Sequence, residues 1–237
     1  MGGLGQARRA EFLMAASALF VVLTVAAMLA YPGGALYDHG SHGYLFFQNF
    51  FSDLGATKTY SGHSNTTSHV LFIVALVGVG LATIGFSTTW RVIAAREGAG
   101  RGFGGVAQAA AIVSGLGFIG IAITPWDRVL DAHNAFVKLA FGVLLVFILS
   151  LLSLQLRNGW PALFVGLNVT YLIVLAIYVL VLFVGPGLGT RNGLEFQVAA
   201  QKMIVYSSVL NIGVQAAGIR REARRASAAA RPRTRRA

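Results

Sequence analysis

The chain has 237 residues, of which 56% are hydrophobic and only 11% charged, and its formal net charge is +11. A soluble globular chain carries about 25% charged residues, so this composition indicates a membrane protein without a sizeable soluble domain. The chain contains no cysteine, which excludes disulfides, thiolate metal sites and a cysteine nucleophile.

Six long apolar segments predict transmembrane helices, because a helix crosses the hydrocarbon core with about 20 apolar residues. The predicted spans are Phe12–Ala30, Val70–Trp90, Val106–Thr124, Ala135–Leu154, Ala162–Val184 and Phe196–Gly218. Their length and lack of alternation argue against strands. The expected fold is therefore all-α and polytopic: a bundle of six transmembrane helices over residues 1–218, with a structured external loop over residues 31–69.

Basic residues are concentrated in alternate connections. Fourteen lie at the N-terminus, in the second and fourth connections and after the last span, whereas the other connections contain only Lys58, Arg128 and Arg191. Basic residues favour the cytoplasmic side, so both termini are expected in the cytoplasm and the histidines outside. We expect a multi-pass protein of a prokaryotic plasma membrane.

The segment 219–237 is rich in arginine and alanine and lacks apolar periodicity. We expect a disordered cytoplasmic tail that anchors the topology. An alternative is that it binds anionic lipid headgroups of the bilayer. No fold or aromatic pattern supports a nucleic-acid partner.

The first external loop has its own local signals. Pro32, Gly33 and Gly34 end the first helix and permit tight turns. Phe47, Phe50, Phe51 and Leu54 follow helical spacing, which predicts a short amphipathic helix capping the bundle. Gly55 is the expected C-cap of this helix, and Ser64 or Asn65 the N-cap of the second span.

Acidic residues and histidines share the predicted outer side. His39, His42 and His133 are candidate metal ligands, because His with Asp or Glu forms zinc sites that keep one position for water. The alternative is that the loop histidines are solvated, while Asp53 and Asp127 cap helices or anchor the loop. The sequence assigns no catalytic residue, cofactor or oligomeric state.

Several motifs resemble a family of uncharacterised membrane proteins. They are Tyr31-Pro-Gly-Gly, Asn49-Phe-Phe-Ser-Asp-Leu-Gly55, Asn65 with Ser68, and Pro125-Trp-Asp127 with His133. Together they resemble the bacterial and archaeal six-span family of domain of unknown function 998, over roughly residues 10–218. The Ser52-Asp53 element is more distantly similar to the eukaryotic Frag1/DRAM/Sfk1 membrane proteins. The first resemblance implies six helices and no established reaction; the second implies lipid organisation or handling of GPI lipids.

Polar residues recur within two spans. Asp131, Asn134 and Lys138 share one face of the fourth span, and Glu195 and Lys202 nearly align on the sixth. An ionisable side chain at membrane depth should face the bundle interior or water. We therefore expect both faces to line one outward-facing polar cavity, with Asp53, Asp127 and His133 near its rim. The alternative is that both lysines extend to the outer headgroups.

A second polar stripe runs along the sixth span. Its members are Gln197, Gln201, Ser208, Asn211 and Gln215. Such side chains hydrogen-bond between helices more often than they line a conduction path.

Three functions fit these features. The first is an integral membrane protein that binds or senses a lipid or small amphiphile at the outward-facing cavity. The second is a membrane-embedded metal-dependent hydrolase using Asp53, Asp127 and His133 with a loop histidine. The third is a transporter of small solutes or protons along the polar faces of the fourth and sixth spans.

Overall fold

Long apolar helices dominate the computed structural model, which describes residues 3–96 and 101–229. The six long helices are α1 (Gly3–Ala30), α2 (Thr66–Arg96), α3 (Arg101–Ile123), α4 (Trp126–Arg157), α5 (Ala162–Val184) and α6 (Arg191–Ala229). At about 1.5 Å of rise per residue, each is long enough to cross the hydrocarbon core of a bilayer.

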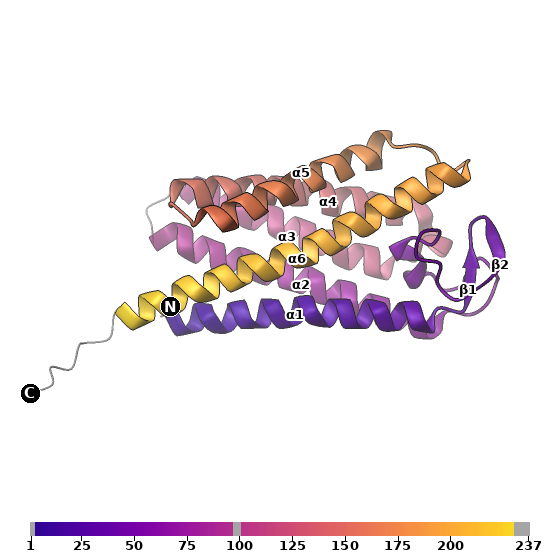
Figure 1. Ribbon diagram of the computed structural model, residues 1–237, viewed down its shortest axis with the longest axis horizontal. Helices are drawn as coiled ribbons and strands as arrows, with labels where there is room; N and C mark the ends of the chain where they lie inside the picture. Colours follow the sequence, from indigo (N-terminus) through magenta and orange to yellow (C-terminus); the bar gives the residue numbers. More distant parts are fainter. Residues whose placement is uncertain (1–2, 97–100, 230–237) are drawn as a thin grey trace, which may run out of the picture.

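The helices form a closed ring. Each one packs against the next in the chain, and α1 packs against α6. The start of α1 and the far end of α6 lie at one end of the bundle, and the loop after α1 lies at the other (Figure 1). The polar residues of that loop are therefore separated from the basic end of the bundle by the length of the helices.

Within the described residues, five helices are both long and apolar enough to cross a membrane, and these are α1 to α5. The chain is therefore an all-helical membrane protein with several candidate spans. Helix α6 is equally long, but its polar stripe and its basic end lower its mean hydropathy. Its burial between α1 and α5 satisfies polar groups that lipid would not.

The predicted spans agree with the helices to different degrees. Helix α5 has the predicted bounds, Ala162–Val184. Helix α4 begins nine residues before the predicted Ala135, at Trp126, and contains a kink at Val129 (φ −141°, ψ 59°). A hydropathy pattern does not detect the first turns of α4, because these turns contain polar side chains.

The basic segment after Gly218 differs from the prediction. Disorder is expected from residue 219, whereas α6 continues to Ala229. Arg220 and Arg224 form ion pairs with Glu11 of α1, at 3.0 and 2.9 Å. This contact with a neighbouring helix supports helical structure that local composition does not predict. Residues 230–237 of the predicted tail lie outside the described part.

Glycines set the closest helix approach. A Cβ on Gly80 of α2 would lie 2.6 Å from the carbonyl oxygen of Gly115 of α3, and a Cβ on Gly115 would lie equally close to the carbonyl oxygen of Gly80. Gly117 of α3 meets Ala140 of α4 in the same way, at 2.9 Å. Small residues permit such contacts between membrane helices.

The loop after α1 forms a compact cap. As predicted, α1 ends before Pro32, and Gly33 and Gly34 adopt positive φ values of 132° and 91°. The chain then forms an antiparallel hairpin of β1 (Gly33–Ala35) and β2 (Asp38–His42), followed by the 3₁₀ helix η1 (Phe51–Gly55). We call residues 31–65 the loop cap; it lies over one end of the bundle (Figure 1).

The predicted amphipathic helix of the loop is only partly correct. Phe51 and Leu54 are buried, but Phe47 is 64% exposed and the helical part has five residues. The side chains of Asn49 and Asp53 accept hydrogen bonds from the backbone amides of Leu45 and Phe50. Such local bonds compete with a regular helix.

Two predicted caps are also corrected. Gly55 is the last residue of η1, and Ala56 is its C-cap. A Cβ on Gly55 would lie 2.5 Å from the Phe72 ring, so the glycine permits close packing on α2. Asn65 does precede α2, but its side-chain amide donates to the carbonyls of η1 instead of capping the helix.

Candidate functional site

A cavity lies inside the bundle below the loop cap. Side chains of α1, α2, α3, α4, α6 and η1 line it. Its apolar lining includes Phe20, Phe51, Leu76, Phe118, Phe141 and Val209. Its volume is about 70 Å³, and it is partly open. Mostly apolar walls with a few polar groups are typical of small-molecule sites.

Most polar side chains that border this cavity already have partners. The Ser17 hydroxyl donates to the Leu13 carbonyl at 3.0 Å. The Gln201 carboxamide oxygen accepts from the backbone N–H of Phe51 at 2.6 Å. His133 is buried, and its Nδ1 lies 2.7 Å from the carbonyl oxygen of Thr124. The cavity is therefore apolar, with a few fixed polar groups.

Asp53 forms the polar centre of the loop cap. It is 1% exposed, and one carboxylate oxygen accepts from the Asn49 amide at 3.1 Å and from the Phe50 backbone N–H at 2.8 Å. Burial raises the pKa of Asp53 to about 7, although both hydrogen bonds and the charge of Lys202 act in the opposite direction. The carboxyl thus titrates near neutral pH.

Lys202 of α6 is buried below the loop cap. Its Nζ donates to the backbone carbonyl of Asn49 at 2.5 Å, and the residue is 3% exposed. The ammonium also lies 5.2 Å from the ring centre of Tyr44 and 5.0 Å from that of Phe46. Aromatic faces stabilise a cation in such a site. The alternative that this lysine extends to the outer headgroups is therefore wrong.

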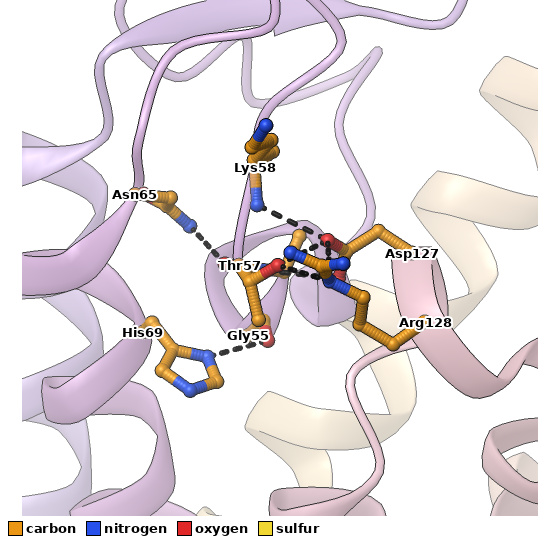
Figure 2. A network of polar contacts seen from close by, with 8 residues as sticks. Gly55, Thr57, Lys58, Asn65, His69, Asp127 and Arg128 are labelled. Atoms are coloured by element: carbon orange, nitrogen blue, oxygen red, sulfur yellow. Dashed lines mark hydrogen bonds and ion pairs between the residues drawn. The ribbon is translucent and has the colours of Figure 1, made fainter.

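Asp127 fastens the loop cap to the start of α4 (Figure 2). Its carboxylate accepts from the backbone N–H and hydroxyl of Thr57, at 2.9 and 2.5 Å, and from the backbone N–H of Lys58 at 3.1 Å. Arg128 also donates to the Thr57 hydroxyl, at 3.0 Å. The sequence alternative that Asp127 anchors the loop describes this geometry.

Helix α2 holds the other side of the loop cap. The Asn65 amide donates to the carbonyls of Leu54 and Ala56, at 3.1 and 2.9 Å. The ring of His69 lies 2.7 Å from the carbonyl oxygen of Gly55 (Figure 2). The cap is therefore attached to α2, α4 and α6 by separate sets of hydrogen bonds.

The structure does not unite the two predicted polar faces. Asp131, Asn134 and Lys138 are exposed, and the Lys138 ammonium lies 5.4 Å from the ring centre of Phe183 on α5. Glu195 pairs with Arg191 at 3.2 Å near the surface. The prediction of one shared polar cavity is therefore wrong.

Helical geometry explains this difference. The buried face of α4 contains His133 and Val137, each directly followed by a residue of the exposed face. Successive residues are about 100° apart around a helix, so Asn134 and Lys138 point away from the interior. Only His133 among the α4 candidates borders the cavity.

The metal candidates are also separated. His39 and His42 are exposed on β2, and His39 stacks on Tyr60 with ring centres 6.0 Å apart. His133 lies inside the bundle. Among the described residues, no three His, Asp or Glu side chains are grouped to hold a metal ion. The predicted set His39, His42 and His133 is wrong because the loop hairpin carries its histidines outward.

The side chains of the polar stripe of α6 hydrogen-bond to other elements, as expected if the stripe serves contacts between helices. Towards the basic end it contributes to a buried network of carboxamides. Gln155 of α4 donates to Gln215 at 2.7 Å, and Asn168 of α5 donates to Gln155 at 3.1 Å. Asn211 donates to Asn168 at 3.2 Å, and Gln215 donates to Asn211 at 3.4 Å, which closes the network.

Sequence reasoning missed several residues of these sites. Asn49 bonds to both Asp53 and Lys202, but the motif that contains it gave it no role. Tyr44 and Phe46 lie against Lys202, and nothing in a single loop sequence distinguishes them from their neighbours. Gln155 and Asn168 carry a clearer signal, since Asn168 is an isolated carboxamide in an apolar span and Gln155 directly follows one. Such residues are expensive in lipid and point to an interhelical partner.

No protein-family model, curated protein or solved structure matches the chain. The two family resemblances thus stay predictions, and the function is argued from the site itself.

Proposed function

We propose that this protein binds a lipid or small amphiphile in the central cavity. The observation that carries the proposal is the apolar cavity between five helices, closed on one side by η1 and bordered by His133, Ser52 and Gln201. An apolar chain fits the walls, and a polar end finds hydrogen-bonding groups near the loop cap. This division matches the two parts of an amphiphile.

Three polar residues that were predicted for the outward-facing cavity have other roles. Lys202, Asp53 and Asp127 all bond to backbone atoms of the loop cap. They hold the closure of the cavity, and the ligand contacts the layer beneath them. The candidate set therefore divides into three closure residues, one cavity residue, His133, and four residues near the surface, which are Asp131, Asn134, Lys138 and Glu195.

The membrane setting belongs to the same proposal. Helix α6 is taken as a sixth span, with both termini in the cytoplasm and the loop cap outside a prokaryotic plasma membrane. The asymmetry of basic residues supports this orientation. The basic residues at the end of α6 favour contact with anionic headgroups of the inner leaflet. Membership of the six-span family with domain of unknown function 998 is consistent with this arrangement.

A photo-crosslinking experiment tests the ligand cavity. The protein is placed in nanodiscs with a diazirine-bearing alkyl probe that has no hydrogen-bond donor, and labelled peptides are mapped by mass spectrometry. We expect label on α2 and α6 residues that line the cavity, and competition by unlabelled chains.

Two adjacent residues provide a matched control. Val209 lines the cavity, whereas Leu210 is 68% exposed. Val209→Phe should fill the space and reduce cavity labelling severalfold, and Leu210→Phe should leave it unchanged. Equal labelling in both variants, or label confined to outward faces, would refute the proposal.

A further inference from the structure

The imidazole of His133 reaches the cavity with one nitrogen already bound. Its Nδ1 lies 2.7 Å from the carbonyl oxygen of Thr124. A carbonyl oxygen only accepts hydrogen bonds, so Nδ1 must carry the hydrogen. In the neutral ring, Nε2 is then a hydrogen-bond acceptor.

This Nε2 atom is available to a ligand. Within the described residues, the bond to Thr124 is the one hydrogen bond that the ring makes. Nε2 is not one of the unpartnered polar atoms that protein encloses completely. His133 is 4% exposed and lines the cavity, so its ring is within reach of a molecule bound there.

Three other polar groups of the cavity already have hydrogen-bond partners. Ser208 donates to the Ile204 carbonyl at 2.7 Å and pairs with the Tyr171 hydroxyl at 2.9 Å. Gln201 accepts from η1 and Ser17 donates within α1. Ser52 also borders the cavity, and its hydroxyl can both donate and accept, whereas Nε2 of His133 only accepts. An unpaired acceptor there favours a ligand that donates.

We infer that the cavity selects a neutral amphiphile whose polar end is a hydroxyl group, which donates its hydrogen to Nε2 of His133. The inference rests on the proposed function and specifies its ligand class. An ether or ester of the same length offers no donor. An ionised carboxylate also lacks a donor and would require a charged imidazolium inside an apolar cavity.

The test compares three competitors of equal chain length against the same alkyl photoprobe in nanodiscs: dodecanol, its methyl ether and dodecanoate. Their concentrations are expressed as mole fractions in the bilayer. We expect dodecanol to displace the probe about 3- to 10-fold better than the ether, the range for one net neutral hydrogen bond. Dioleoylglycerol, tested in parallel, shows whether the preferred hydroxyl belongs to a two-chain lipid or a single-chain alcohol.

Two substitutions assign the preference to one nitrogen. His133→Asn places an amide near the position of Nδ1 and removes the Nε2 acceptor. The Kd of the ether divided by the Kd of dodecanol should then fall towards the ratio measured in bilayers without protein. His133→Gln places a carboxamide oxygen near Nε2 and should keep part of the ratio. Because each variant is compared with itself, the ratio is insensitive to modest losses of stability.

The outcomes separate the inference from the proposed function. Displacement by all three compounds with no alcohol preference in the unmodified protein overturns the hydroxyl inference, and the cavity proposal survives. A preference for dodecanoate also overturns it, since that requires the charged ring. No displacement by any compound removes both. If His133→Asn leaves the alcohol preference unchanged, the hydroxyl donates to an atom other than Nε2 of His133. That result overturns the assignment.

Discussion

The ammonium of Lys202 donates a hydrogen bond to the backbone carbonyl of Asn49 over 2.5 Å, although 153 positions separate the two residues. Asn49 in turn donates to the carboxylate of Asp53 at 3.1 Å. This relay couples the last helix to the loop cap, and it places a buried cation near a buried acid. The pH dependence of stability should report on it.

The contribution of Asp53 to the free energy of unfolding should decrease as the pH rises. Its native pKa is about 7, above the value of about 3.9 expected in the unfolded chain. The native state therefore holds the proton more tightly, so stability is full below about pH 4, declines as the pH rises towards 7, and is level above that. Thermal unfolding in detergent between pH 4 and 9 measures this, and Asp53→Asn should flatten that part of the curve.

Lys202→Met should shift the same curve. The lysine charge lowers the pKa of Asp53, so its removal raises that pKa and extends the decline to higher pH. Lys138→Met is the matched control, because Lys138 is exposed beside Phe183 and should leave the curve in place. Equal shifts in both variants would contradict the buried relay.

Asp127→Ala should loosen the loop cap without opening the bundle. Its carboxylate accepts three hydrogen bonds from Thr57 and Lys58, and these donors would lose their partner. We expect a loss of about 1–2 kcal/mol in local stability, or roughly tenfold faster amide exchange at residues 57 and 58. Hydrogen exchange followed by mass spectrometry measures this. Asp131→Ala, on the exposed part of α4, should change nothing, and unchanged exchange in Asp127→Ala would refute the anchor.

Gly80→Ala should weaken the packing of α2 on α3. The added Cβ would lie 2.6 Å from the Gly115 carbonyl oxygen, so the helices must separate. We expect a loss of about 1–3 kcal/mol in unfolding free energy, as for other overpacked contacts. Gly78→Ala, two residues earlier, meets open space and should be neutral or slightly stabilising. A smaller loss for Gly80→Ala than for Gly78→Ala would contradict the contact.

The proposed topology makes a simple prediction. A reporter that is active only outside the cytoplasm should be silent when fused after Ala237 and active when inserted at Ser61–Ser64. The physical reason is the preference of clustered arginines for the cytoplasmic side. The reverse pattern would place the loop cap and its histidines inside the cell.

The helices could be predicted because apolar length is a local property. The segment Ala162–Val184 is bounded by Pro161 and by Gly185-Pro186, and the observed helix has the same limits. The kinked start of α4 and the continuation of α6 could not be predicted this way. They depend on contacts made by Asp127 with the loop and by Glu11 with two arginines.

The site was less accessible to sequence reasoning than the fold. Lys138 and Lys202 look alike in the sequence, each a single lysine near the loop-cap end of a predicted span. Only tertiary structure shows that Lys138 lies on the surface of the bundle, while Lys202 is enclosed by Tyr44, Phe46 and Asn49. A lysine near the interface can reach headgroups from an outward face, so a polar face need not turn inward there.

The carboxamide network of Gln155, Asn168, Asn211 and Gln215 has a consequence for how the bundle assembles. Apolar surfaces give little preference for one axial position of a helix over another in lipid, because the lipid tails are equally apolar. A slide of α6 by one turn, about 5.4 Å, would break the bond of Gln155 to Gln215 and the bond of Asn211 to Asn168. The network therefore fixes the axial register of α4, α5 and α6. It also determines the height at which Lys202, thirteen residues before Gln215 on the same helix, meets the loop cap.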